Sequence, residues 1–179
     1  MGVAFAEVWY EGTVLGECAL IFVTVGGMRA FDRLVREMDR VAAELNEQVV
    51  MQIGSTDYQP KNCDYFRFMP RSDMQKLYAE ASVVVCHAGS GSILAALEHN
   101  KPLVVVPRLK KYGEVFDDHQ VEIARQMEAQ GAKVVYDMND LQSAMSNAQP
   151  GLPAPGAAGN LAGRLKEYLD WLDRSLKQA

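Results

Sequence analysis

A glycine-rich segment that directly follows an apolar run is the strongest chemical signal in the sequence. It reads HAGSGSIL at 87–94 and follows the segment SVVVC at 82–86. Its glycines permit a tight turn and close approach of the backbone to a ligand. The free N–H groups at the start of a following helix can hold phosphate oxygens, and His87, Ser90 and Ser92 add polar side chains. The segment predicts a phosphate-binding loop, with a plain strand-to-helix turn capped by a serine as an equally weighted alternative.

This segment departs from two common nucleotide-binding motifs. No Gly-Lys-Ser/Thr follows it, so it is not a Walker loop. Gly89 and Gly91 match the first two glycines of the dinucleotide fingerprint, but Leu94 stands where a third glycine or an alanine is expected. An oxidoreductase on a dinucleotide-binding fold is therefore disfavoured.

Two other loops carry residues suited to the same ligand. Gly26 and Gly27 separate an apolar run from a helical pattern. Their N–H groups could reach the ligand, but taken alone an ordinary strand-to-helix loop explains them better. The segment DDHQ at 117–120 opens a helix and can read sugar hydroxyls. Capping by the aspartates is one alternative. A metal site is another, disfavoured because consecutive helical positions point in different directions.

A short basic segment lies just before that helix. Arg108, Lys110 and Lys111 follow the apolar residues 103–106 in a chain whose net charge is −5. The segment could meet a diphosphate or an acidic sugar, and a merely solvated loop explains it equally well.

The elements that must position these loops alternate along the chain. We expect strands at 19–25, 49–53, 64–68, 82–86, 103–106 and 133–136, and helices at 31–46, 72–81, 90–99, 117–130 and 141–147. Ser72 or Asp73 is expected to cap the second helix. The strands are nearly continuous apolar runs, which predicts an α/β fold: a Rossmann-like parallel sheet with helices on both faces. Ligands bind such sheets at the carboxyl ends of the strands, where these loops lie.

The composition fits one globular domain and excludes several classes of protein. The chain has 179 residues, of which 49% are apolar and 23% charged. A net charge of −5 weighs against nucleic-acid binding. Cys18, Cys63 and Cys86 are widely spaced, which predicts reduced thiols in the cytoplasm. No apolar run approaches the ~20 residues of a membrane-spanning helix, so membrane association is expected to be peripheral or through a partner.

Changes in composition divide the chain into four parts. We expect an extension at 1–18, the Rossmann-like domain at 19–148, a Pro/Gly linker at 149–159 and an amphipathic helix at 160–179. The leucine face of that last helix could pack on its own domain or on another subunit. A chain of this length is not expected to hold a complete active site between two full domains.

Several motifs in order carry a resemblance to a known family. They read IFVTVGG at 21–27, VVVCHAGSGSIL at 83–94, NKPLVVVPR at 100–108, GEVFDDHQ at 113–120 and GAKVV at 131–135. Over roughly residues 20–140 the chain resembles the C-terminal, donor-binding domain of family 28 glycosyltransferases. This group includes MurG-type enzymes and the small catalytic subunit of the eukaryotic two-subunit UDP-N-acetylglucosamine transferase. The greatest likeness is to short exopolysaccharide glycosyltransferase subunits of the PssE type.

The resemblance implies the C-terminal half of a GT-B fold and a set of contacts to a UDP-sugar. The residues implied at the diphosphate are Gly26, Gly27, His87, Gly89, Ser90, Gly91 and Ser92. Those implied at the uracil are Phe68 and Met69, those at the sugar are Asp118, His119 and Gln120, and Arg108 lies between these sites. Many members grip the ribose with an acidic residue where this chain has Ala95. Ribose recognition is therefore expected to be weaker or to come from elsewhere.

The resemblance also implies a reaction and partners. An acceptor hydroxyl would attack the anomeric carbon with inversion, and helix N-termini would stabilise the departing diphosphate, so no cofactor or metal is expected. No catalytic base is assigned to this chain. It is expected on a membrane-associated acceptor-binding subunit that completes the GT-B fold, with a lipid-linked saccharide as acceptor at the cytoplasmic face of the inner membrane.

Several choices remain open from the sequence. The donor sugar and homo-oligomerisation are not determined by any motif. The second hypothesis for function is a non-catalytic nucleotide-sugar-binding regulatory module with the same fold.

Overall fold

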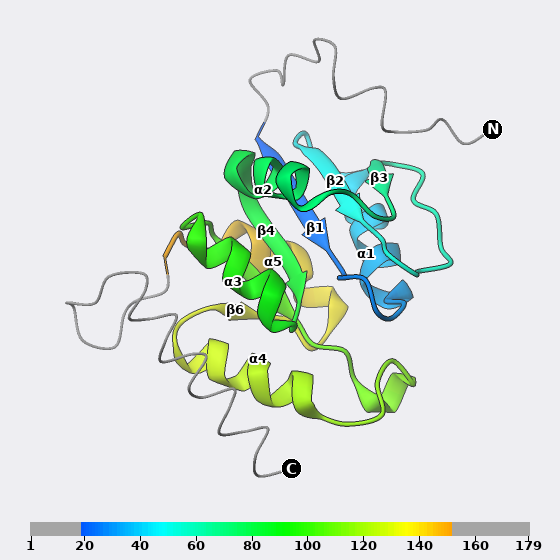
Figure 1. Ribbon diagram of the computed structural model, residues 1–179, viewed down its shortest axis with the longest axis vertical. Coiled ribbons are helices and arrows are strands. Elements are labelled where there is room, and N and C mark those ends of the chain that lie inside the picture. Colours follow the sequence, from blue (N-terminus) through cyan, green and yellow to red (C-terminus); the bar gives the residue numbers. More distant parts are fainter. Residues whose placement is uncertain (1–18, 152–179) are drawn as a thin grey trace.

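A six-stranded parallel sheet with helices on both faces forms the part of the chain that the computed structural model describes, residues 19–151 (Figure 1). The strands are β1 (Leu20–Thr24), β2 (Gln48–Gln52), β3 (Asp64–Phe66), β4 (Ala81–His87), β5 (Leu103–Val106) and β6 (Lys133–Val134). The helices are α1 (Asp32–Ala42), α2 (Arg71–Glu80), α3 (Ser90–Glu98), α4 (His119–Ala129) and α5 (Leu141–Ser146), with 3-10 turns η1 (Lys110–Tyr112) and η2 (Met138–Asp140). The α/β Rossmann-like fold predicted from the apolar runs is confirmed.

The central strand shows why the apolar runs are continuous. Along β1, Leu20 and Phe22 belong to one buried cluster, which α2, α3 and α4 complete. Ile21 and Val23 belong to a second cluster on the opposite face, which α1 and α5 complete. Figure 1 shows α2, α3 and α4 in front of the sheet and α1 behind it. Because successive residues of a strand face opposite sides, a strand covered on both faces needs apolar residues at every position.

The order of the strands fixes where the loops meet. The sheet runs β3-β2-β1-β4-β5-β6, and every neighbouring pair is parallel. In sequence order, the sheet begins at the central strand β1 and extends through β2 to the edge strand β3. Strand β4 then pairs with the other side of β1, and β5 and β6 follow it to the opposite edge. Connections leave the carboxyl ends of β1 and β4 toward opposite sides, which opens a crevice at this point of the sheet.

Most element boundaries agree with the sequence predictions within a few residues. Helix α1 ends at Ala42, short of the expected residue 46, and β6 is only two residues long. The predicted cap of α2 is wrong: Pro70 is its N-cap residue, and no side chain caps the helix. The carbonyl of Pro70 already accepts the N–H of Asp73 at 3.0 Å, so Ser72 and Asp73 lie inside the first turn.

Several expectations lie outside the described residues. These are the extension at 1–18, the linker beyond residue 151 and the amphipathic helix at 160–179. Within residues 19–151, no helix is long and apolar enough to cross a membrane.

Candidate functional site

A cavity of about 540 Å³ opens at the carboxyl ends of β1, β4 and β5. Three loops line it: the β1–α1 loop, the β4–α3 loop and the β5–α4 loop. These are the loops that the sequence singled out. Predicted site residues along its wall are Gly27, His87, Gly89, Ser90, Gly91, Ser92, Arg108, His119 and Gln120. The topology thus gathers in one place residues that are nearly a hundred positions apart in the sequence.

The imidazole of His87 is held between two glycines. A Cβ atom added to Gly26 would lie 2.7 Å from Cε1 of His87, and one added to Gly89 would lie 2.1 Å from its Nε2. Gly26 also has a φ of +72°, a conformation that side chains disfavour. Gly26 does not itself line the cavity. Both glycines therefore make room for the histidine ring, which then forms part of the cavity wall.

His87 is uncharged at neutral pH. Burial of the ring, together with the nearby positive charge of Arg108, lowers the pKa of His87 to about 4. Its Nδ1 atom is buried and has no hydrogen-bond partner among the described residues. A neutral imidazole keeps one N–H donor and one acceptor. Because Nδ1 is buried, a hydrogen bond from His87 to a ligand in the cavity would have to be made by Nε2.

Helix α3 begins in the wall of the cavity. Its N-cap residue is Gly89, and no side chain caps the helix, so the alternative of a serine-capped turn is wrong. The first N–H groups of an α-helix have no partner inside the helix and carry its partial positive charge. Gly91 is exposed, and a Cβ added there meets nothing within 4 Å. Space in front of this turn is therefore available to an anionic ligand.

Arg108 is buried and secures the β1–α1 loop. Its Nη2 donates to the carbonyls of Val25 at 2.8 Å and Arg29 at 2.6 Å, and its Nε donates to that of Ala30 at 3.2 Å. The guanidinium also lies over the ring of Phe31, 4.7 Å from its centroid. Burial lowers the pKa of Arg108 to about 10, so the group remains a cation at neutral pH. The structure gives Arg108 a supporting role, and its contact with a ligand stays a prediction.

The start of α4 contributes the polar groups expected at a sugar. The side-chain oxygen of Gln120 accepts the backbone N–H of Arg108 at 3.0 Å, which leaves the amide nitrogen free to donate. Nδ1 of His119 lies 3.8 Å from Glu122. Asp117 lines the cavity and accepts the N–H of His119 at 3.2 Å. Asp118 is the N-cap residue, yet its side chain makes no capping bond and lies outside the cavity lining.

The two residues expected at the uracil lie outside the lining of this cavity. The Phe68 side chain is 62% exposed, and its ring lies beside the β1–α1 loop, 3.5 Å from where a Cβ of Gly27 would stand. Met69 is partly buried and packs against the cluster beneath α2, α3 and α4. Only Phe68 is placed to extend the wall of the site, and the uracil contact stays a prediction.

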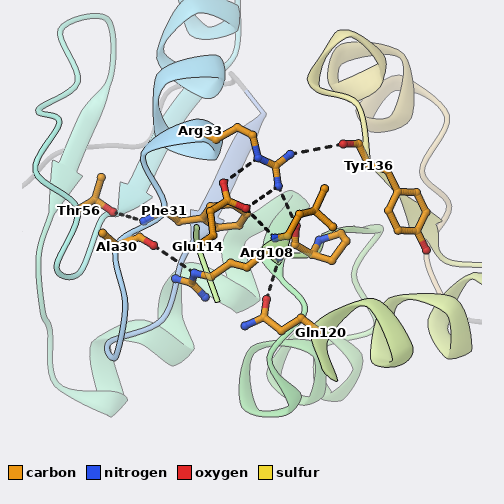
Figure 2. Close-up of polar contacts among 10 residues, drawn as sticks. Ala30, Phe31, Arg33, Thr56, Arg108, Glu114, Gln120 and Tyr136 are labelled. Atoms are coloured by element: carbon orange, nitrogen blue, oxygen red, sulfur yellow. Dashed lines mark hydrogen bonds and ion pairs between the residues drawn. The ribbon is translucent and has the colours of Figure 1, made fainter. Parts of the chain in front are cut away.

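Sequence reasoning missed an ion pair next to the site. Arg33 and Glu114 form two parallel hydrogen bonds, of 2.8 and 3.0 Å (Figure 2). Glu114 lies in the GEVFDDHQ motif quoted above, but Arg33 lies 81 positions away and outside the quoted motifs, so no local pattern pairs them.

The exposed side chains at the mouth of the cavity were also missed. Met28 is 93% and Phe116 80% exposed, and both line the cavity. The guanidinium of Arg29 lies over the Phe116 ring, 4.3 Å from its centroid. This contact joins the β1–α1 and β5–α4 loops across the mouth.

Neither metal ligation nor thiol chemistry is visible in the described part of the chain. No three His, Cys, Asp or Glu side chains of residues 19–151 are grouped to hold a metal ion. Cys86 is buried, and burial raises the pKa of the Cys63 thiol to about 12. Both are free thiols, and Cys18 lies outside the described residues.

Fold and site together define the Rossmann-like, C-terminal half of a GT-B glycosyltransferase. The sequence model of the glycosyltransferase family 28 C-terminal domain matches residues 20–148, and the chain belongs to this family. Solved structures share the fold: the glycosyltransferase of kitacinnamycin aligns with a TM-score of 0.60 at 21% identity, over 82% of this chain and 38% of its own. The NMR structure of ALG13 aligns with a TM-score of 0.52 at 20% identity, over 78% of this chain and 92% of its own.

Sequence relatives include N-acetylglucosamine transferases and a UDP-N-acetylglucosamine transferase subunit. UDP-N-acetylglucosamine transferase subunit ALG13 of Homo sapiens is 32% identical over 126 residues, 62% of this chain and 10% of the relative. The subunit from Eremothecium gossypii is 29% identical over 79% of this chain and 71% of its own. A Chlorobium luteolum pyrophosphoryl-undecaprenol N-acetylglucosamine transferase is 30% identical over 82% of this chain and 45% of its own. The chain spans about a tenth of the human and mouse proteins.

Proposed function

We propose that this chain is the donor-binding, catalytic subunit of an inverting glycosyltransferase. It moves a sugar from a UDP-sugar to a lipid-linked saccharide, in exopolysaccharide or related glycan synthesis. The observation that carries the proposal is the cavity where the connections of β1 and β4 diverge, with the start of α3 in its wall. Parallel sheets bind nucleotide phosphates at such positions. The names of the human and Chlorobium relatives support a UDP-N-acetylglucosamine donor.

Each part of the cavity has a role in this reaction. The N–H groups at the start of α3, the serine hydroxyls and neutral His87 hold the diphosphate and stabilise the charge that develops as it departs. The amide nitrogen of Gln120 donates to a sugar oxygen. The reaction requires no metal ion, because these fixed dipoles supply the stabilisation.

A second subunit completes the site in this proposal. Met28 and Phe116 expose large apolar side chains around the mouth of the cavity, as is common where a protein partner binds. The partner is membrane-associated, binds the lipid-linked acceptor and supplies the general base. It holds this chain at the cytoplasmic face of the membrane. The word subunit in the names of the ALG13 relatives supports this arrangement.

Calorimetric titration tests donor binding directly. The folded chain should bind UDP and UDP-N-acetylglucosamine, and replacing His119 and Gln120 with alanine should weaken UDP-sugar binding about fivefold or more, since each lost hydrogen bond is worth about 1 kcal/mol. UDP affinity should change less than twofold. Gln126→Ala, an exposed position on the same helix, is the matched control.

Two results would overturn parts of the proposal. A folded wild-type chain that binds neither ligand would exclude the donor site, and equal losses for UDP and UDP-sugar would exclude the sugar contact at α4. Transfer assays with and without an acceptor-binding subunit separate the two functional hypotheses. Donor binding without transfer in the reconstituted pair would favour the non-catalytic module.

A further inference from the structure

The ion pair between Arg33 and Glu114 lies at the centre of a partly buried polar network (Figure 2). The side chains are only 15% and 10% exposed. Nη2 of Arg33 also donates to the carbonyl of Pro107 at 2.9 Å, and the backbone N–H of Leu109 donates to Glu114 at 2.8 Å. A paired carboxylate and guanidinium with these further partners form a geometrically specific contact.

This pair anchors the long segment between β5 and α4. Residues 110–113 and 116–118 of the segment are exposed, and η1 is its only regular structure. Glu114 points inward from the middle of the segment and is fixed by groups from α1 and from Leu109. This inward-facing carboxylate therefore anchors the middle of the segment, between buried Arg108 at its start and the Arg29–Phe116 contact nearer its end.

The anchored segment leads directly into the sugar-facing part of the cavity. Phe116, Asp117, His119 and Gln120, all in the cavity wall, follow Glu114 within six residues. A second contact, from the Arg108 N–H to Gln120, fixes the far end of this stretch. The phosphate-facing residues 87–92 belong to another loop, whereas the hydrogen bonds of the pair run to Pro107, Leu109 and Tyr136.

We propose that Arg33 and Glu114 are positioning residues for the sugar portion of the donor. By fixing residues 115–120 they set the distance between the start of α4 and the sugar, while the diphosphate site is independent of them. The inference rests on the proposed function for the identity of the ligand. The anchoring of the loop itself does not depend on that function.

Paired titrations of milder variants test this role. Arg33→Lys keeps the positive charge but cannot form the bidentate hydrogen bonds to Glu114, and Glu114→Gln keeps the side-chain shape but loses the negative charge. Each should lower affinity for UDP-N-acetylglucosamine about tenfold, because small displacements of positioning groups are costly, and affinity for UDP less than twofold. Arg40→Lys and Glu44→Gln, which alter an exposed ion pair at the far end of α1, are the matched controls.

A loss shared equally by UDP and UDP-N-acetylglucosamine would show a merely structural role and overturn the proposal, as would no change in either. If Glu114→Gln fails to fold by circular dichroism, Glu114→Asp replaces it, because the shorter side chain keeps the charge but cannot span both Arg33 and Leu109.

Hydrogen–deuterium exchange provides a readout that needs no ligand. Arg33→Lys and Glu114→Gln should raise amide exchange at residues 109–118 and leave 87–92 unchanged, whereas the two controls should change neither. Unchanged exchange at 109–118 would overturn the anchoring. If the wild-type chain binds no UDP, the proposed function fails, and this measurement still decides whether the pair positions the loop.

Discussion

At the scale of single residues, His87 accounts for the two glycines that surround it. Gly26 and Gly89 have no space for a side chain because the imidazole ring fills it. The glycines could be interpreted from the sequence as permitting close approach of a ligand, and the structure shows that their first neighbour is a histidine. The cost of this packing is that the ring is buried in its uncharged form.

The burial of His87 predicts a specific loss of stability in acid. In the unfolded chain the imidazole titrates near its ordinary pKa of 6.5, whereas in the folded chain its pKa is about 4. The unfolded state therefore binds a proton first as the pH falls, so stability is fully present above 6.5 and declines between 6.5 and 4, by up to about 3 kcal/mol. Urea unfolding at pH 7, 6, 5 and 4.5 measures this decline.

The comparison that isolates His87 uses His87→Asn. This variant should have a smaller dependence of unfolding free energy on pH than wild type across the same interval, even if its absolute stability is lower. The pKa of Asp39 is lowered from 3.8 by hydrogen bonds that outweigh its burial. The stability that the ionised Asp39 contributes to the fold is therefore lost only at still lower pH. If the unfolding free energies of wild type and His87→Asn declined in parallel as the pH falls, His87 would not be buried in its uncharged form.

At the scale of helices, strands and loops, hydrophobic pattern was sufficient for most of the fold. Every strand and α-helix within 19–151 was predicted, because strands buried on both faces leave unbroken apolar runs and glycines punctuate their ends, whereas the 3-10 turns η1 and η2 were not. The cluster of three loops followed from the general rule for parallel sheets. The start of α2 was misplaced because Pro70 begins the helix without a side-chain cap.

Contacts between residues that are far apart in the sequence could not be predicted from hydrophobic pattern. Arg108 looked like part of an exposed basic segment with Lys110 and Lys111, but its guanidinium turns inward to the backbone of the β1–α1 loop. Arg33 and Glu114 gave no local signal at all. Such pairs depend on how loops from different strands fold over one edge of the sheet, and single-sequence periodicity carries no information about that arrangement.

The first turn of α3 provides a prediction for Gly91. A Cβ at this position meets no protein atom within 4 Å, so Gly91→Ala should leave stability unchanged or raise it by about 0.5–1 kcal/mol, as expected for alanine in a helix. The added methyl group would instead occupy space beside the first N–H groups. We expect UDP affinity to fall about tenfold or more, measured by calorimetry alongside thermal unfolding.

The contrasting variant is Gly89→Ala. Its Cβ would clash with the His87 ring, so it should reduce both stability and UDP binding. If Gly91→Ala bound UDP as tightly as wild type, the phosphate would not lie against the start of α3.

At the scale of the whole molecule, one edge of the sheet concentrates the unusual features. Among the described residues, the exposed large hydrophobic side chains are Met28, Phe68, Tyr112 and Phe116. All four lie in loops that follow the carboxyl ends of strands, around or near the cavity. The opposite edge carries none of them among residues 19–151. This asymmetry is what a domain that binds a ligand and a partner at the same edge would show.

Arg108 connects the two halves of the sheet at this edge. It follows β5, on one side of the crevice, and binds carbonyls of Val25, Arg29 and Ala30 after β1, on the other side. Figure 2 shows the bond to Ala30. Arg108→Met should therefore lower the free energy of unfolding of the whole domain by about 3 kcal/mol, because it removes three charge-assisted hydrogen bonds and leaves partly buried carbonyls unpaired. Arg125→Met, at an exposed position on α4, should change it by less than about 0.5 kcal/mol. Urea unfolding compares the two, and a loss below about 1 kcal/mol for Arg108→Met would mean that the halves are held together by the strand pairing of β1 with β4 and not by this side chain.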